Sequence, residues 1–155
     1  GGRHQGIAQQ GSRRERSSGD LGAPGGNSNA SFIAWMEPNA APYNPSPLVY
    51  ENRFYVLWDF GFLSCRDAAT GREVYDKQRI KPEGSAAFTA SPWAGRGRIF
   101  CLSEDGDTYV FTAGDTFQRE RVNSLGEMCM ATPALVRDSL VLRTLAAVYR
   151  IRESR

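Results

Sequence analysis

The side chains that most often carry out chemistry are few and scattered in this sequence. His4 is the one histidine, so a histidine-based catalytic triad, metal site or proton shuttle is nearly excluded. Cys65, Cys101 and Cys129 show no C-x-x-C spacing, so neither a zinc site nor a thioredoxin-like site is indicated. Because Cys65 and Cys101 lie in apolar runs, we expect both to be buried free thiols. A disulfide between these two and a nucleophilic role remain the alternatives.

One acidic cluster, Glu104-Asp105-Gly106-Asp107, has the residue types of a cation site. It lacks the twelve-residue ligand pattern of a calcium loop, and such residues also favour tight turns. We therefore read it as a hairpin turn, with a surface cation site as the alternative. The sequence predicts no catalytic residue and no metal site.

Composition narrows the class of protein. The 155 residues carry a net charge of +2, which is not the clustered basic footprint expected of a nucleic-acid-binding protein. Hydrophobic residues make up 41%, enough for a core, and no apolar run approaches the roughly 18 residues of a membrane span. The 16 glycines and 8 prolines suit a turn-rich β protein. We expect no nucleic-acid partner and no membrane span.

The first part of the chain, residues 1–30, is rich in glycine and arginine and poor in large aliphatic residues. Such a segment cannot bury enough apolar surface to offset its ordering entropy, so we predict a flexible segment or insertion. Binding of a polyanion by the arginines at positions 13, 14 and 16 is the weaker alternative. We expect order to begin near Ser31, with Phe32–Trp35 as a short buried strand.

The rest of the chain, residues 31–155, repeats itself. Ser46-Pro47, Ser91-Pro92 and Thr132-Pro133 recur 45 and 41 residues apart, and an apolar triplet follows each pair. Proline has no backbone N–H, so each pair is read as the start of an innermost strand. A period of 40–45 residues built from strand-sized pieces is typical of β-propeller blades.

Each unit has the length of one four-stranded blade. In the first unit, the turn residues predict antiparallel strands over 48–50, 53–58, 62–66 and 72–78. In the last unit, residues 134–151 contain no glycine and have good helix propensity. The repeat register favours strands there, and an amphipathic helix is the alternative. We therefore divide the repeat region into four parts: 31–42, the end of a preceding blade; 43–80, a blade; 85–123, a blade; and 128–155, a final three-strand blade.

The segment from Cys65 to Tyr75 resembles a known family. It is similar to the eleven-residue Ala-x-Asp-x-x-Thr-Gly-Lys-x-x-Trp signature of PQQ-like propeller repeats, with Asp67, Thr70 and Gly71 matching. That family includes quinoprotein dehydrogenases, the periplasmic lipoprotein of the outer-membrane barrel-assembly machinery and many uncharacterised exported bacterial proteins. The resemblance implies that the aspartate and threonine bond turn amides while the aromatic residue, here Tyr75, wedges between blades.

The resemblance also has limits. In the second unit, residues 110–115 no longer match the signature. Trp35 lies 40 residues before Tyr75, so we expect it to fill the wedge position of a preceding unit. The expected fold is all-β, a partial propeller of about three blades. Because a closed propeller needs about four to eight blades, we expect further blades upstream and Arg155 near the C-terminus.

The resemblance implies where a site would lie and what it would hold. Residues just before each innermost strand should reach the mouth of the central channel, and they give our candidate binding residues: Tyr43, Asn44, Phe88, Thr89, Met128 with Met130, and Cys129. Packing of the channel wall is the alternative role. We predict a periplasmic or extracellular, non-catalytic scaffold that binds a protein or small ligand without a cofactor. A PQQ-dependent dehydrogenase, which would hold PQQ with calcium, and an outer-membrane assembly scaffold are the alternatives.

Overall fold

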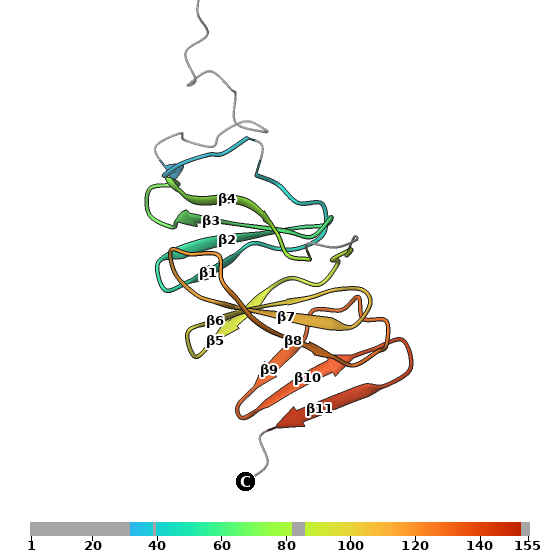
Figure 1. Ribbon diagram of the computed structural model, residues 1–155. Helices are drawn as coiled ribbons and strands as arrows, with labels where there is room; N and C mark the ends of the chain where they lie inside the picture. The colour runs from blue at the N-terminus through green and yellow to red at the C-terminus, as the bar shows by residue number, and fades with distance from the viewer. Residues whose placement is uncertain (1–31, 39, 82–85, 153–155) are drawn as a thin grey trace, which may run out of the picture. The chain divides into compact units, whose positions relative to one another are not determined.

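The computed structural model describes residues 32–38, 40–81 and 86–152. The chain divides into two compact units, residues 1–33 and residues 34–155. In the first unit only Phe32 and Ile33 are described, while the second contains all the strands that the structure describes (Figure 1). The strands form three antiparallel sheets, so the predicted all-β fold is confirmed. Among the described residues, no helix has the length and apolar character needed to cross a membrane.

The first sheet is a complete four-stranded blade in which each strand pairs with the next along the chain. Pro47 precedes the first strand, where a missing N–H costs no ladder bond. Glu51 and Asn52 have φ angles of 48° and 59°, the backbone of a two-residue hairpin turn. Its strands are β1 (Leu48–Tyr50), β2 (Arg53–Trp58), β3 (Phe62–Asp67) and β4 (Glu73–Arg79).

The second sheet repeats this plan. Arg96 and Gly97, with φ angles of 52° and 70°, form the same hairpin turn between its first two strands. Every residue of its outermost strand is exposed. The strands are β5 (Trp93–Gly95), β6 (Arg98–Leu102), β7 (Asp107–Thr112) and β8 (Arg119–Ser124).

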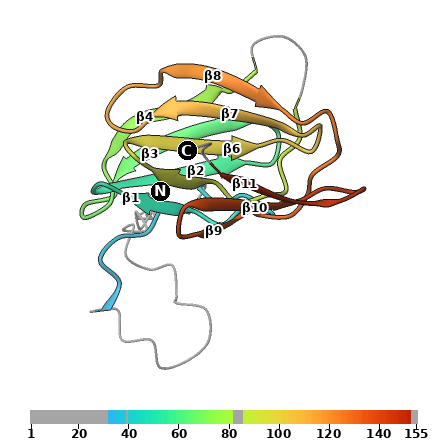
Figure 2. The ribbon, with the colours of Figure 1, turned by 90° about the horizontal axis from the view of Figure 1, so that it is seen from below.

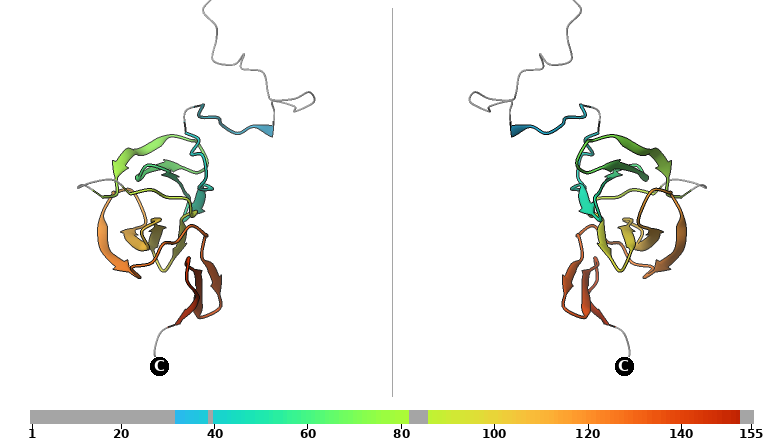
Figure 3. Two further views of the ribbon diagram at one scale, coloured as in Figure 1. Left: turned by 90° about the vertical axis from the view of Figure 1, so that its right-hand side faces the viewer. Right: turned by 90° about the vertical axis from the view of Figure 1, so that its left-hand side faces the viewer.

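The third sheet has three strands, β9 (Ala134–Val136), β10 (Ser139–Arg143) and β11 (Val148–Arg152). The register pairs Leu140 with both Leu135 and Ile151, so apolar side chains share one face. The strand interpretation of this segment is therefore confirmed and the helical alternative is wrong. Figure 3 shows this sheet following the two complete blades.

Two apolar clusters hold the sheets together. The larger cluster lies between the first and second sheets, and fully buried Tyr55, Leu57, Ile99 and Phe111 belong to it. The smaller cluster joins the second and third sheets through Trp93, Leu102, Cys129 and Leu142, with Ala90 beside them. Seen from below in Figure 2, the third sheet lies beside the inner strands of the second. Apolar burial therefore stabilises the interface between the first two sheets more than the interface between the second and third.

A chain of hydroxyl hydrogen bonds explains why Ser/Thr-Pro recurs. The backbone N–H of Ser46 donates to Ser91 Oγ over 2.9 Å. In turn, the N–H of Ser91 donates to Thr132 Oγ1 over 2.8 Å. Each unit therefore supplies the acceptor for the unit before it, which fixes the starts of the innermost strands relative to one another.

Glycine recurs where a neighbouring segment crosses the turn between the second and third strands of a blade. A Cβ on Gly61, at φ +79°, would lie 2.9 Å from the carbonyl oxygen of Ala86. The corresponding atom on Gly106, at φ +88°, would overlap the backbone of Glu127. These close approaches and the positive φ angles both require glycine.

One sequence expectation is wrong: Phe32–Trp35 is not a buried strand. Phe32 is 86% exposed, and the segment forms no ladder with another described segment. An apolar run becomes a strand only where a partner strand satisfies its backbone groups. Trp35 alone is anchored, through its indole N–H to the carbonyl oxygen of Ala68 over 3.0 Å.

Candidate functional site

The predicted channel-mouth residues of the first blade are held by a carboxylate. Asp59, in the turn after β2, accepts hydrogen bonds from the backbone N–H groups of Tyr43 over 2.7 Å and Asn44 over 2.9 Å. The side-chain amide of Asn44 adds a third bond over 3.1 Å. Partial burial opposes the charge, but these hydrogen bonds outweigh it and hold the pKa of Asp59 below its usual value. Asp59 therefore serves as an ionised anchor for this segment.

The second blade uses the same plan with different side chains. Glu104 lies 45 residues after Asp59, in the equivalent turn, and accepts a 2.5 Å hydrogen bond from the hydroxyl of Thr89. The backbone N–H of Phe88 donates to the carbonyl oxygen of Asp59 over 2.9 Å. The second mouth segment is thus bonded both to its own blade and to the blade before it.

In the third blade, the mouth segment around Met128 and Cys129 is tied in both directions. The N–H of Cys129 donates to the Glu104 carbonyl over 3.0 Å, and the N–H of Leu145 donates to the Met128 carbonyl over 2.8 Å. Glu127 accepts hydrogen bonds from the hydroxyls of Thr144 over 2.6 Å and Tyr149 over 2.5 Å. Those bonds lower the pKa of Glu127.

The first two mouth segments enclose a pocket of about 290 Å³. It brings together four predicted site residues, Tyr43, Asn44, Phe88 and Thr89. Met128, Cys129 and Met130 do not line it. Sequence reasoning missed four lining residues, Asp59, Phe60, Ala87 and Glu104. It read the segments that hold Asp59, Phe60 and Glu104 chiefly as structural turns. Asp59 and Glu104 are 45 residues apart, the same spacing as between Ser46-Pro47 and Ser91-Pro92. This spacing is the sequence signal that could have identified these two residues.

Large apolar side chains are exposed around the mouth. Tyr43 is 92% exposed, Phe60 80%, Leu145 79% and Met128 51%. They come from the mouth segments and the turns between second and third strands, and the Leu145–Met128 backbone bond joins two of them. Exposed apolar side chains that lie together and are bordered by polar residues are typical of interaction sites.

The side chains of the three cysteines are buried. Within the described part of the chain, Cys65, Cys101 and Cys129 are buried free thiols, so the disulfide alternative is wrong. Burial raises the pKa of Cys65 to about 11, which leaves little nucleophilic thiolate at neutral pH.

The described residues gather no cluster of metal-ligating side chains at the channel mouth. Residues 32–38, 40–81 and 86–152 contain no group of three or more histidine, cysteine, aspartate or glutamate side chains able to hold a metal ion. Calcium takes six to eight oxygen ligands. The carboxylates at the mouth, Asp59 and Glu104, instead bind donors of their own chain.

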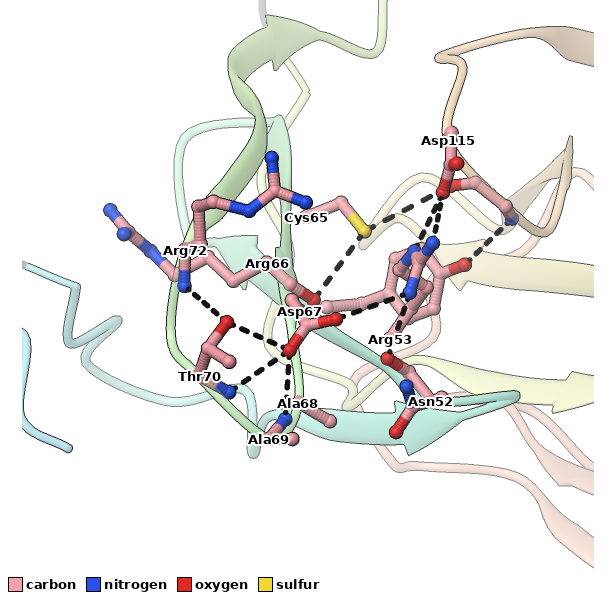
Figure 4. A network of polar contacts seen from close by, with 12 residues as sticks. Asn52, Arg53, Cys65, Arg66, Asp67, Ala68, Ala69, Thr70, Arg72 and Asp115 are labelled. Atoms are coloured by element: carbon pink, nitrogen blue, oxygen red, sulfur yellow. Dashed lines mark hydrogen bonds and ion pairs between the residues drawn. The ribbon is translucent and has the colours of Figure 1, made fainter. Parts of the chain in front are cut away.

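The signature turn has a structural role (Figure 4). Oδ1 of Asp67 accepts hydrogen bonds from the N–H groups of Ala69 and Thr70 and, over 2.8 Å, from the Thr70 hydroxyl. Arg53 lies 3.6 Å from the other Asp67 oxygen and 2.6 Å from Asp115 of the second blade. The turn is therefore closed locally and connected to the next blade.

Aromatic residues pack where the wedge positions are expected. The Trp35 ring lies edge-on to Phe54, with centroids 5.1 Å apart, and so close to Gly71 that a Cβ there would lie 2.7 Å from the ring. Tyr75 packs against Phe117 of the second blade, with ring centroids 6.0 Å apart. Both rings thus contact the unit that follows them in the chain.

The blade plan is found in solved structures, although no family model and no curated protein matches the sequence. BamB from Moraxella catarrhalis is similar with a TM-score of 0.57 and 17% identity, covering 77% of this chain and 36% of that one. The quinohemoprotein alcohol dehydrogenase ADHIIG from Pseudomonas putida HK5 is similar with a TM-score of 0.50 and 17% identity, covering 64% and 16%.

These likenesses show the fold of the chain: it is built from β-propeller blades. The Cys65–Tyr75 segment resembles PQQ-like propeller repeats, and both solved structures share their blade fold with this chain. The chain spans about a third of the length of the BamB structure and about a sixth of the dehydrogenase.

Proposed function

We propose that the chain is part of a larger exported PQQ-like propeller that acts as a non-catalytic binding scaffold. A protein or small ligand would bind at the channel mouth. The observation that supports this most is the arrangement at the mouth. Asp59 accepts hydrogen bonds from backbone N–H groups, and Glu104 and Glu127 accept them from side-chain hydroxyls, whereas the side chains of Tyr43 and Phe60 are exposed. Rigidly held apolar groups bind a partner at low entropic cost.

The partner best suited to this surface is a protein. Aromatic residues and methionine are enriched in protein interfaces, and Tyr43, Phe60 and Met128 are such residues. The pocket of about 290 Å³ beside Tyr43 and Phe60 is large enough for one anchoring side chain. Export to the periplasm or cell surface is supported by the family resemblance.

The test compares variants of the full-length protein. Tyr43→Ser combined with Phe60→Ser removes exposed apolar area without touching the hydrogen bonds of Asp59. We expect this variant to keep its thermal unfolding midpoint and to lose a partner recovered by cross-linking in intact cells. Val49→Ser, which changes an exposed residue on β1, is the matched control. Equal recovery by the variant and wild type would contradict the proposal.

A quinoprotein dehydrogenase is the second candidate, favoured by the likeness to the Pseudomonas putida enzyme. In that case the missing ligands would come from other blades. Titration of full-length protein with PQQ and calcium distinguishes the two candidates, because a dehydrogenase binds the cofactor stoichiometrically. Absence of cofactor binding eliminates this candidate.

An outer-membrane assembly scaffold is the third candidate, favoured by the likeness to BamB. It requires an upstream lipoprotein signal and co-purification with the barrel-assembly complex. If either the signal or the co-purification is absent, this candidate is eliminated, and the general scaffold function is unaffected.

A further inference from the structure

The mouth pocket between the first and second sheets combines negative charge with an apolar wall. The turn after β2 contributes Asp59 and Phe60 to its lining, and the turn after β6 contributes Glu104. Phe88, which is buried, adds an aromatic ring from the segment before β5. The described lining residues include no arginine, lysine or histidine. The pocket therefore has two carboxylates and no basic side chain to balance them.

Both carboxylates keep acceptor capacity that their own chain does not use. Asp59 accepts three hydrogen bonds, two on Oδ1 and one on Oδ2. Glu104 accepts one bond, from the Thr89 hydroxyl to Oε1, and its Oε2 accepts none from the described residues. Because an ionised carboxylate offers about four acceptor positions, each of the two groups can accept a further donor.

The blade plan does not require a carboxylate at the position of Glu104. Leu145 lies 41 residues later, which is the spacing between the last two Ser/Thr-Pro pairs. The N–H of Glu104 donates to the Ala87 carbonyl over 2.9 Å, and the N–H of Leu145 donates to the Met128 carbonyl over 2.8 Å. The turn forms the same backbone bond with leucine as with glutamate. The charge of Glu104 is thus available for a role other than closing its turn.

Phe60 places an exposed ring beside this charge. Its side chain is 80% exposed. Asp105, 45 residues later in the equivalent turn, is exposed although a described sheet lies on each side of the second blade. The exposure of this turn position therefore belongs to the blade plan. An aromatic ring next to carboxylates suits a planar cation, which stacks on the ring while its N–H groups donate to the oxygens.

We propose that this pocket binds an arginine side chain of the partner protein. The guanidinium donates hydrogen bonds to Asp59 and Glu104 and stacks on Phe60, while the aliphatic part of the side chain contacts Phe88. Arginine suits the pocket better than lysine because its five N–H donors lie in one plane, whereas an ammonium is a compact point charge. The inference rests on the function proposed above, since it names the group that the partner places at the mouth.

The first test uses the full-length protein and a short fluorescent peptide that carries one central arginine between leucines. The matched peptide has citrulline in that place, which keeps the shape of the side chain and removes its charge. We expect saturable binding of the arginine peptide by anisotropy, weakened by added salt. The citrulline peptide should bind at least about tenfold more weakly, because charge-assisted hydrogen bonds are lost.

The second test changes one carboxylate of the pocket. Glu104→Gln keeps an oxygen that accepts the Thr89 hydroxyl and removes the charge, so the thermal midpoint should stay unchanged. We expect this variant to bind the arginine peptide at least about fivefold more weakly than wild type does. Glu51→Gln is the matched control, because Glu51 is exposed in the β1–β2 turn at the opposite end of the strands. It should leave the affinity unchanged.

Three results would overturn the inference. Equal affinities for the arginine and citrulline peptides, or no saturable binding of either, show that the pocket does not recognise the charge. A lysine peptide that binds as tightly as the arginine peptide shows that a planar guanidinium is not required. Unchanged affinity in Glu104→Gln, with the thermal midpoint of wild type, shows that the arginine binds elsewhere.

Cross-linking from position 60 in intact cells separates this inference from the function on which it rests. A cross-linked partner protein, together with equal binding of the arginine and citrulline peptides, contradicts the arginine site and supports the scaffold function. Charge-dependent binding of the arginine peptide without any cross-linked partner supports the site and contradicts the scaffold function.

Discussion

Some positions of the blade accept only one residue type, and Gly71 is the clearest example. Its φ of +72° strains any other residue, and the Trp35 ring occupies the space of a Cβ. We expect Gly71→Ala to lower the free energy of unfolding by about 2–4 kcal/mol, the sum of backbone strain and overpacking. Gly97→Ala is the control, since Gly97 has φ +70° with no atom within 4 Å of a Cβ; it should cost about 1 kcal/mol. Urea denaturation measures both, and equal losses would contradict the role of Trp35.

Asp67 gives a prediction for acid pH. The hydrogen bond from the Thr70 hydroxyl, followed by those from backbone N–H groups, lowers the pKa of Asp67 below the ordinary 3.8. A carboxyl whose folded pKa is depressed stabilises the fold above its unfolded pKa, and this contribution disappears as pH falls through the folded value. We expect Asp67→Asn to lower the thermal midpoint at pH 6 and to differ less from wild type near pH 3. Asp76→Asn, at an exposed position of β4, is the control and should leave the thermal midpoint at pH 6 unchanged.

At the scale of strands and turns, the hydroxyl chain explains how blades keep their register. Ser91→Ala removes the acceptor of the Ser46 N–H, so we expect a loss of about 1 kcal/mol in the free energy of unfolding. Ser91→Thr keeps the hydroxyl and should retain most of the stability. Chemical denaturation of both variants checks this, and equal losses would show that the hydroxyl is not what matters.

Repeat spacing predicted the elements better than local propensity did. Over 134–151 the residues favour a helix, yet β9 to β11 form strands that pair with one another and pack through Leu142 against the second sheet. The apolar run Phe32–Trp35 predicted a buried strand, and this prediction is wrong because the described residues supply no partner strand.

The candidate site was predictable only in part. Four mouth residues share one pocket, as the repeat spacing implied. Asp59 and Glu104 were missed because the same residue types build ordinary turns, and only their contacts with Tyr43 and Thr89 reveal the anchoring role.

At the scale of the whole molecule, the two interfaces between sheets differ in strength. Cys65 and Cys101 lie in the large cluster between the first two sheets, whereas Cys129 lies in the small one beside the third sheet. Because the smaller cluster buries fewer apolar side chains, the third sheet should separate from the second at a lower free energy than the first two sheets separate. We expect Cys129 to react with a thiol reagent before the other two in mild denaturant, measured by mass spectrometry of labelled peptides. Simultaneous labelling would instead show a single cooperative unit.

The central claim is that the propeller binds a partner protein through its channel mouth. Site-specific photo-cross-linking in intact cells tests it most directly, with the photoreactive residue placed at Phe60 in the full-length protein. Glu51, exposed in the β1–β2 turn at the opposite end of the strands, is the matched position. The account predicts one discrete cross-linked species from position 60 and none from position 51. Cross-linking from position 51 alone, or from neither position, would contradict it.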